Sequence, residues 1–216
     1  MGTYAAVVLA GGAARRMGGV DKPTVPVGGR PMRDRVLAAV SDATPRVLVG
    51  PVDGVPEGVR VTREDPPGGG PVAATAAGLA LLEPGTTLVA LLAADLPLLT
   101  RAAIGELLAS LTSTWAARTK GSSPGTSGVE PRPEGACFVD AQGRRQSLCG
   151  VWRVAALRAG LDRLAAERGG TLVGAPVRAL LAGLVVREVP WSGDGPPPWF
   201  DCDTDEDVRR AEEWAR

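Results

Sequence analysis

The sequence predicts a doubly wound α/β fold, a three-layer α/β/α sandwich around a mostly parallel sheet. Strand and helix patterns alternate through the first half of the chain, as they do when helices connect parallel strands. The run 87–93 is continuously apolar, which is typical of a strand covered on both faces. The chain has 216 residues, which is enough for one domain with a sizeable core.

The N-terminal elements are predicted from short apolar runs and from proline and glycine signals. Tyr4–Leu9 is an apolar run that predicts a buried strand. Prolines and glycines at 26–31 indicate a turn. The helix predicted after it, at 32–42, carries apolar residues on one face. Two further strands are expected at 46–50 and 59–61.

The remaining elements continue the alternation and then become less regular. Pro71 suits the first turn of a helix at 71–83, and Thr100 can cap a helix at 101–111. Polar stretches rich in Gly, Ser and Pro predict flexible loops at 119–135 and 192–198. The second half is expected to contain strands at 114–118, 136–139, 146–152 and 184–189, helices at 154–168 and 176–182, and a closing helix that ends at Trp214.

Composition excludes several classes of site. The chain has no histidine, which excludes a Ser-His-Asp triad, a Cys-His pair and histidine metal ligands. A metal would therefore be held by carboxylates and phosphates, which favours Mg²⁺. The three cysteines are scattered and are expected to be reduced thiols without a catalytic role. A formal net charge of zero predicts no nucleic-acid partner, and short apolar runs predict a cytoplasmic protein without a membrane span.

A glycine-rich segment, 9–22, follows the first predicted strand. Gly11 and Gly12 let the backbone approach a ligand closely, and the N–H groups of such a loop can bind phosphate oxygens. Arg16 and Lys22 add positive charge, and Lys22 is one of only two lysines in the chain. The segment is not a P-loop, because a proline follows the lysine, nor a dinucleotide fingerprint, because the glycines are adjacent. It predicts a polyphosphate site of another kind.

Acidic residues lie where a doubly wound sheet binds its ligands, after the strand ends. Asp95 directly follows the most apolar strand, where a charge is costly unless it is paired or binds metal. Capping the next helix is its alternative role, and Thr100 is better placed for that. Asp203 lies in an acidic stretch that fits a helix cap, so Asp203 belongs either to the cap or to a metal site. Asp65 precedes the Pro- and Gly-rich segment 67–71.

The segment L-A-G-G-A-A-R-R-M-G-G-V-D-K at 9–22 resembles the signature of the MobA-like NTP transferases. Three further stretches match this family in the same order: Asp65 followed by P-G-G-G-P, A-D-L-P at 94–97, and D-C-D-T-D-E-D at 201–207. Q-S-L-C-G-V-W at 146–152 is similar to the family's segment near the second substrate. The resemblance extends over essentially the whole chain.

The resemblance implies a Rossmann-like nucleotide-diphospho-sugar transferase fold and Mg²⁺-dependent transfer of GMP from GTP to the molybdenum pterin cofactor, with release of pyrophosphate. A single domain 1–216 would divide into a nucleotide-binding half at 1–112 and an acceptor-binding half at 113–216. The implied catalytic residues are Arg16, Lys22 and Asp95; the nucleotide-binding residues are Leu9, Ala10, Gly11, Gly12, Lys22, Asp65, Gly70 and Asp95; the metal ligands are Asp95 and Asp203; and Gln146 would bind the acceptor. The implied partners are these small molecules and, transiently, molybdoenzymes or cofactor-insertion proteins.

Two other hypotheses remain open at the level of sequence. Gly50 stands where the family often has Asn, and the loops 119–135 and 192–198 lie in the acceptor-binding half. The sequence therefore does not decide between GMP and CMP transfer, nor between the pterin and another phosphorylated acceptor. A nucleotide-binding module without turnover is the second alternative, and the presence of Lys22 and Asp95 argues against it. Magnesium-dependent pyrophosphate release would separate an enzyme from a binding module.

Overall fold

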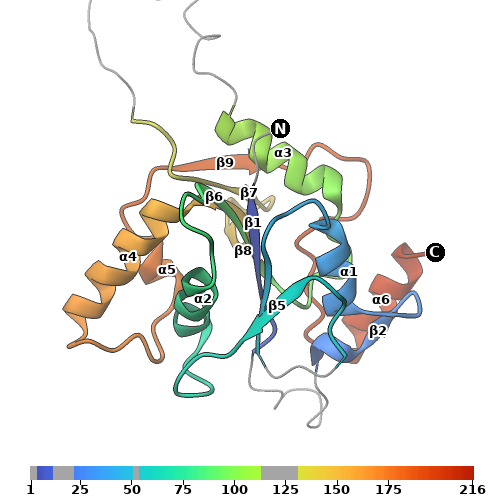
Figure 1. Cartoon of the computed structure of the whole chain (residues 1–216). Helices are drawn as coiled ribbons and strands as arrows, with labels where there is room; N and C mark the ends of the chain where they lie inside the picture. Colours follow the sequence, from blue (N-terminus) through green and yellow to red (C-terminus); the bar gives the residue numbers. More distant parts are fainter. Residues whose placement is uncertain (1–3, 12–21, 51–53, 113–130) are drawn as a thin grey trace, which may run out of the picture.

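The computed structural model describes residues 4–11, 22–50, 54–112 and 131–216. Seven strands form one sheet in the order β5-β4-β1-β6-β8-β7-β9 (Figure 1). Their bounds are β1 (Ala5–Leu9), β4 (Arg46–Val49), β5 (Val59–Thr62), β6 (Leu88–Ala93), β7 (Gly135–Val139), β8 (Arg145–Arg153) and β9 (Val186–Pro190). β8 pairs antiparallel with β6 and β7, and the other neighbours pair in parallel. The prediction of a mostly parallel sheet is confirmed.

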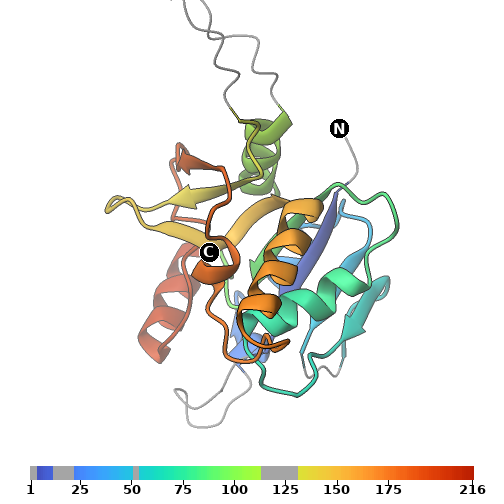
Figure 2. The same cartoon turned by 90° about the vertical axis from the view of Figure 1, so that its left-hand side faces the viewer.

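Helices cover both faces of this sheet. These helices are α1 (Met32–Ala39), α2 (Pro71–Ala80), α3 (Arg101–Thr112), α4 (Val154–Glu167) and α5 (Val177–Leu180), and a further helix, α6 (Asp205–Trp214), lies beside the sheet. α1 and α3 pack on one face, and α2, α4 and α5 pack on the other, which Figure 2 turns toward the viewer. The result is the predicted three-layer sandwich. None of the helices in the described ranges is long and apolar enough to cross a membrane.

A small third cluster attaches α6 to the rest of the fold. The 3-10 turn η2 (Lys22–Thr24) leads into a hairpin of β2 (Pro26–Val27) and β3 (Arg30–Pro31). Val27 of this hairpin and Ala211 of α6 are both fully buried in the cluster. The C-terminal helix therefore packs beside the segment that begins at Lys22.

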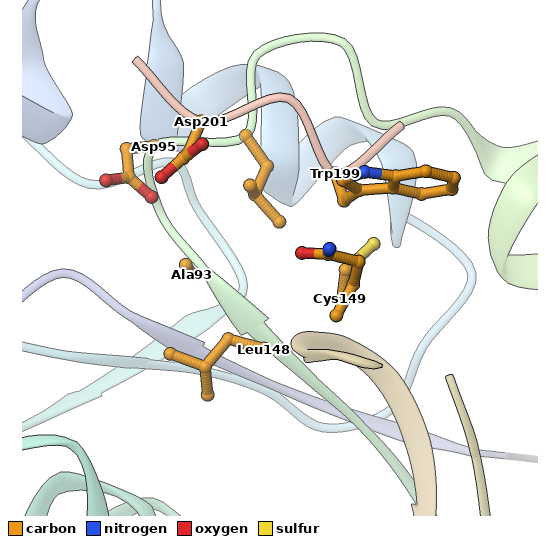
Figure 3. Close-up of a pocket in the computed structure, with 8 residues that line it drawn as sticks. Ala93, Asp95, Leu148, Cys149, Trp199 and Asp201 are labelled. Atoms are coloured by element: carbon orange, nitrogen blue, oxygen red, sulfur yellow. The ribbon is translucent and has the colours of Figure 1, made fainter. Parts of the chain in front are cut away.

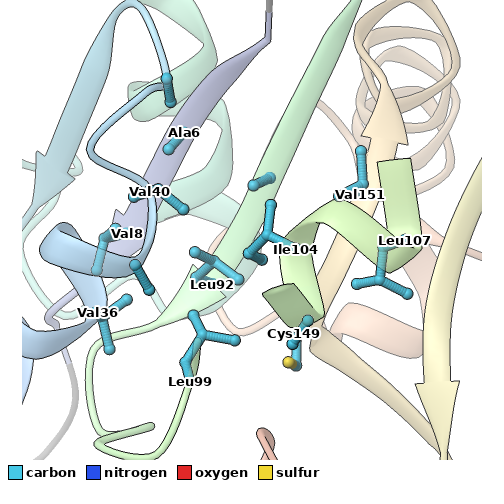
Figure 4. Close-up of a cluster of buried hydrophobic side chains, with 14 of the residues drawn as sticks. Ala6, Val8, Val36, Val40, Leu92, Leu99, Ile104, Leu107, Cys149 and Val151 are labelled. Carbon is cyan, nitrogen blue, oxygen red and sulfur yellow. The ribbon is translucent and has the colours of Figure 1, made fainter. Parts of the chain in front are cut away.

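Burial on both faces explains why β1 is apolar throughout. All five of its residues are buried, and they alternate between two clusters because successive side chains of a strand point to opposite faces. Ala6 and Val8 contribute to the cluster under α1 and α3, where Ile104 packs close to Leu92 (Figure 4). Each fully buried aliphatic side chain of this kind stabilises the fold by about 1.5–3 kcal/mol.

Gly78 allows α2 to lie close to β1. A Cβ atom at Gly78 would stand 2.4 Å from Cγ1 of Val7 and 3.1 Å from Cγ2 of Val49. Side-chain carbons do not approach this closely, so the helix and the sheet can meet here only at a glycine. Gly78 lowers the helix propensity of this segment, but its lack of a side chain is what allows α2 to pack against β1.

Several element boundaries differ from the sequence prediction for local reasons. α2 ends at Ala80 because the N–H groups of Leu81 and Leu82 bond three residues back, in a tighter turn. β9 begins at Val186 because Leu184 still donates to a carbonyl of the turn after α5. The predicted turn at 26–31 contains the short β2–β3 hairpin. The predicted strand 114–118 and most of the loop 119–135 lie outside the described residues.

Candidate active site

The carboxyl ends of four parallel strands meet along one edge of the sheet. Three backbone hydrogen bonds continue the ladders past the strand ends: Gly50 N–H to Thr62 at 3.0 Å, Ala10 N–H to Val49 at 2.8 Å, and Ala94 N–H to Leu9 at 3.0 Å. These bonds hold the first residues after β4, β1 and β6 in register. This is the edge at which doubly wound sheets bind their ligands.

Lys22 joins two acids that are far apart in the sequence. Its Nζ atom donates to Oδ2 of Asp95 at 2.7 Å and to Oδ1 of Asp203 at 2.6 Å. The side chains of Lys22 and Asp95 are only 19% and 24% exposed, whereas that of Asp203 is 51% exposed. Two carboxylates and one ammonium group therefore converge at the strand edge, partly shielded from water.

The pKa of Lys22 is raised above its ordinary value of 10.5. Burial of the ammonium group by itself lowers the pKa, but the hydrogen bonds and charges of Asp203 and Asp95 outweigh that effect. Lys22 therefore keeps its positive charge throughout the neutral pH range.

The start of α6 holds Asp203 in place. Asp207 Oδ2 accepts from the N–H of Asp203 at 3.1 Å and from the N–H of Thr204 at 2.9 Å. The hydroxyl of Thr204 accepts from the N–H of Asp207 at 3.2 Å, which completes a capping box. The Cys202 N–H donates to the carbonyl of Asp95 at 3.3 Å. The cap thus explains the acidic stretch and also directs Asp203 toward Lys22.

A pocket of about 220 Å³ opens beside Asp95. Asp95 and Asp201 lie close together at one end of it, and Trp199 lies at the other (Figure 3). Gln146 also lines this pocket, and its amide nitrogen donates to Oδ2 of Asp140 at 3.3 Å. Burial, followed by the Asp203 charge, raises the pKa of Asp201 above 3.8. The pocket therefore combines a crowded acidic end with an aromatic end.

Aromatic packing holds Trp199 in the wall of this pocket. Its ring centroid lies 5.3 Å from that of Phe138, which is fully buried in the sheet, and Trp191 meets Phe138 edge-on at 5.5 Å. Such pairs add to the stability gained from area burial alone. Trp199, the residue directly after the predicted loop 192–198, is therefore held in a fixed position.

The other end of the strand edge is built from glycine and a buried acid. Gly50 has a φ of +147°, and a Cβ atom there would stand 2.9 Å from both Ala10 C and Gly11 N. The backbone of this chain therefore leaves no room for an asparagine side chain at Gly50. Glu64 is buried with 6% of its surface exposed, whereas the side chain of Asp65 is exposed.

The structure brings most of the predicted site residues to one edge. Leu9, Ala10, Gly11, Lys22, Asp95 and Asp203 gather there, and Gln146 shares the adjoining pocket with Asp95. Gly70 precedes α2 as its N-cap with a φ of 91°. Gly12 and Arg16 lie outside the described residues. Sequence reasoning missed Glu64 and Trp199, because neither belongs to a motif and both depend on tertiary contacts.

The two converging carboxylates fit a hard divalent cation. Across residues 4–11, 22–50, 54–112 and 131–216 no cluster of three or more His, Cys, Asp or Glu side chains has a metal-binding arrangement. Asp95 and Asp203 nevertheless converge on one cationic atom, the Lys22 Nζ. Mg²⁺ commonly uses one or two carboxylates and completes its shell with water and substrate phosphates. The donor set is therefore suited to Mg²⁺ in the presence of a nucleotide.

Comparison with known proteins assigns the family. Residues 6–182 match the model of the MobA-like NTP transferase domain. The chain belongs to this family. A molybdenum cofactor guanylyltransferase of Bradyrhizobium sp. (strain ORS 278) is 30% identical over 220 residues, which cover 97% of this chain and 92% of the relative. The MobA-like chain is accordingly a nucleotidyltransferase.

Solved structures share the fold of this MobA-like chain. Molybdopterin-guanine dinucleotide biosynthesis protein A from Archaeoglobus fulgidus aligns with a TM-score of 0.64 at 18% identity, over 96% of each chain. A 2-C-methyl-D-erythritol 4-phosphate cytidylyltransferase from Thermus thermophilus aligns with a TM-score of 0.65 at 18% identity, over 99% of this chain and 98% of the other. At these identities the likeness concerns the fold alone.

Proposed function

We propose that this chain transfers GMP from GTP to the phosphate of the molybdenum pterin cofactor and releases pyrophosphate. The observation that carries the proposal is the contact of Lys22 with both Asp95 and Asp203 at the sheet edge. A cation between two acids beside a glycine-rich loop suits the handling of a triphosphate. The family and the name of the Bradyrhizobium relative support guanylyl transfer.

The proposed reaction needs charge neutralisation and positioning. An oxygen of the acceptor phosphate forms a bond to the α-phosphorus of GTP. The bond from that phosphorus to the bridging oxygen breaks, and its electron pair leaves with pyrophosphate. The acceptor phosphate is already anionic, so no general base is required, in agreement with a chain that has no histidine. Catalysis then depends on orientation and on stabilising the developing charge.

Each part of the edge has a task in this scheme. The Lys22 ammonium, which stays protonated, binds a phosphate oxygen as a compact charge. The backbone of Leu9, Ala10 and Gly11 lies against the nucleotide, with the segment from Asp65 to Gly70 beside it. Asp95 and Asp203 would hold Mg²⁺, which supplies neutralisation of the triphosphate charge when bound. Gly12 and Arg16 keep their predicted phosphate roles.

The pocket beside Asp95 suits the acceptor. Its lining includes Gln146, the residue predicted to bind the second substrate, and the ring of Trp199. An amide and a rigid aromatic surface are the groups expected to orient a planar heterocycle. The acceptor would thus approach the nucleotide from the β8 side of the edge.

A nucleotide panel tests the proposal. The protein is mixed with Mg²⁺ and GTP, CTP, ATP or UTP, first alone for thermal stabilisation and then with the pterin acceptor for pyrophosphate release. A ligand at about 100 times its Kd stabilises the folded state by about 2.7 kcal/mol, which raises Tm by roughly 5–10 °C in a chain of this size. Preference for GTP supports the proposal, and preference for CTP moves the product to a cytidine cofactor. Binding of GTP without pyrophosphate release would favour the non-catalytic module.

A further inference from the structure

Glu64 carries a carboxylate that the folded chain satisfies only in part. Oε1 accepts from the N–H of Gly68 at 3.0 Å. Oε2 is buried and has no hydrogen-bond partner in the part of the chain that the structure describes. A carboxylate oxygen kept from water without a donor is destabilising. An acid retained in this state therefore suggests a donor that arrives with a ligand.

This acid lies beside the beginning of the nucleotide loop. A Cβ atom at Gly11 would stand 3.4 Å from Oε1 and 3.8 Å from Oε2 of Glu64. Gly11 is exposed, and Gly50 next to it also has no side chain. A planar base laid against this bare backbone would lie next to Glu64, and the carboxylate would meet the base by turning outward from its buried position.

The spacing along the edge suits one bound nucleotide. Glu64 follows β5, and Asp95 follows β6, with β4 and β1 between them. Three strand spacings, about 14 Å, separate the strands that carry the two acids, but the Glu64 side chain reaches back to Gly11 at the end of β1, the neighbour of β6. The Glu64 carboxylate and Asp95 therefore lie along one edge at less than that separation, and a bound nucleoside triphosphate could place its phosphates at Lys22 and its base at Glu64.

We infer that Glu64 is the residue that selects guanine, an inference that rests on the proposed function. Guanine presents two adjacent donors on its pairing edge, N1–H and the N2 amino group, and a carboxylate presents two acceptor oxygens. Oε1 can serve here because a carboxylate oxygen accepts more than one hydrogen bond. Cytosine and adenine place a ring-nitrogen lone pair beside their single amino group, and uracil flanks its one N–H with carbonyls. Glu64 therefore favours GTP over CTP.

The test exchanges one atom of the acid and one atom of the base. Glu64→Gln replaces one acceptor oxygen with an amino donor, which opposes the guanine N2 group but matches the C2 carbonyl of xanthine. We expect kcat/KM for GTP to fall about 10- to 100-fold, as for the loss of a hydrogen bond to a charged group, while the value for XTP rises. In the wild type, ITP, which lacks the N2 amino group, should be weaker than GTP by a similar factor. Glu57→Gln, an exposed acid between β4 and β5, is the matched control and should keep the wild-type preference.

Thermal stabilisation by GTP, ITP and XTP provides a second readout that does not require turnover. A wild type that uses GTP while Glu64→Gln keeps the same order of preference overturns the inference and leaves the proposed function intact. If Asp65→Asn, and not Glu64→Gln, changes the preference from GTP to XTP, the neighbouring acid binds the base, and the inference about Glu64 is overturned. A wild type that neither binds nor uses GTP defeats both proposals. If Glu64→Gln does not fold, equal use of GTP, ITP and XTP by the wild type is sufficient to reject a carboxylate reader.

Discussion

Replacing Asp95 with Asn separates the role of its charge from its role in folding. The Asp95 carboxylate accepts from Lys22 at 2.7 Å, and its side chain is 24% exposed. A hydrogen bond to a charged group contributes about 1.5–3 kcal/mol, but Asn keeps an acceptor oxygen and Lys22 keeps Asp203. The expected loss is therefore about 1–2 kcal/mol, or roughly 2–8 °C in Tm.

Turnover should suffer far more than stability. Removal of one preorganised electrostatic group typically lowers kcat by about 10²- to 10³-fold, and Asp95 also serves as a proposed Mg²⁺ ligand. The assay is pyrophosphate release with GTP and the pterin acceptor over a series of Mg²⁺ concentrations, combined with thermal unfolding. Asp162→Asn, which removes an equal charge from the exposed side of α4, is the control and should behave as wild type. Wild-type kcat in Asp95→Asn would refute the assignment, and a much larger loss of Tm would show that the acid is chiefly structural.

The other predictions concern packing, capping, ionisation and thiol reactivity. Gly78→Ala should destabilise the fold by about 1–3 kcal/mol through overpacking against Val7, whereas Gly105→Ala, where a Cβ atom meets nothing within 4 Å, should stabilise α3 by about 0.5–1 kcal/mol; urea unfolding of both variants checks the contrast. Asp207→Ala should lower the free energy of unfolding by about 0.5–2 kcal/mol through loss of the α6 cap. It should also lower kcat, because Asp207 holds Asp203 in place, and an unchanged kcat would show that the cap does not position the site. Burial and a neighbouring acid raise the folded-state pKa of Asp201 above 3.8, so protonation stabilises the fold below that pH and this contribution is lost as the pH rises through the folded value. The stability of Asp201→Asn relative to wild type should therefore increase from acidic to neutral pH. A difference in the free energy of unfolding, measured with urea, that stays constant across this pH range would contradict the raised pKa. The three cysteine thiols are buried, and burial raises their pKa values, so they should react with a thiol reagent only as the protein unfolds; rapid labelling of the native protein would disagree.

The three-layer arrangement could be predicted from the sequence because the strands of the parallel half appear there as separate short apolar runs. β6 is an unbroken apolar run that is buried on both faces, and Thr100 caps α3 as predicted, with its hydroxyl accepting from the N–H of Ala103 at 3.2 Å. Helix ends were predicted less accurately. The chain after Ala80 remains apolar, and only the tighter bonding of Leu81 and Leu82 ends α2 there.

The candidate site was predictable where a motif and a strand end coincide. Asp95 satisfies both conditions, Lys22 belongs to the motif that follows β1, and the two residues are in contact. Asp203 was ambiguous because its stretch is also a capping box, and the structure uses the stretch for the cap while turning Asp203 to Lys22. Glu64 could not be preferred to Asp65 from sequence, because the difference between them is burial beside Gly11, which depends on the pairing of β1 with β4 and of β4 with β5.

The contact between Lys22 and Asp203 has a consequence for biosynthesis, because 181 residues separate the partners. At a translation rate of about 5–20 residues per second, the glycine-rich loop leaves the ribosome roughly 10–40 s before the second acid does. The nascent chain can pair β1, β4, β5 and β6 during that interval, yet it still lacks one of the two carboxylates at their edge. A ribosome-bound chain stalled before residue 203 would thus hold these four strands without the complete pair of acids, and under the proposed function the onset of activity would mark the arrival of the final helix.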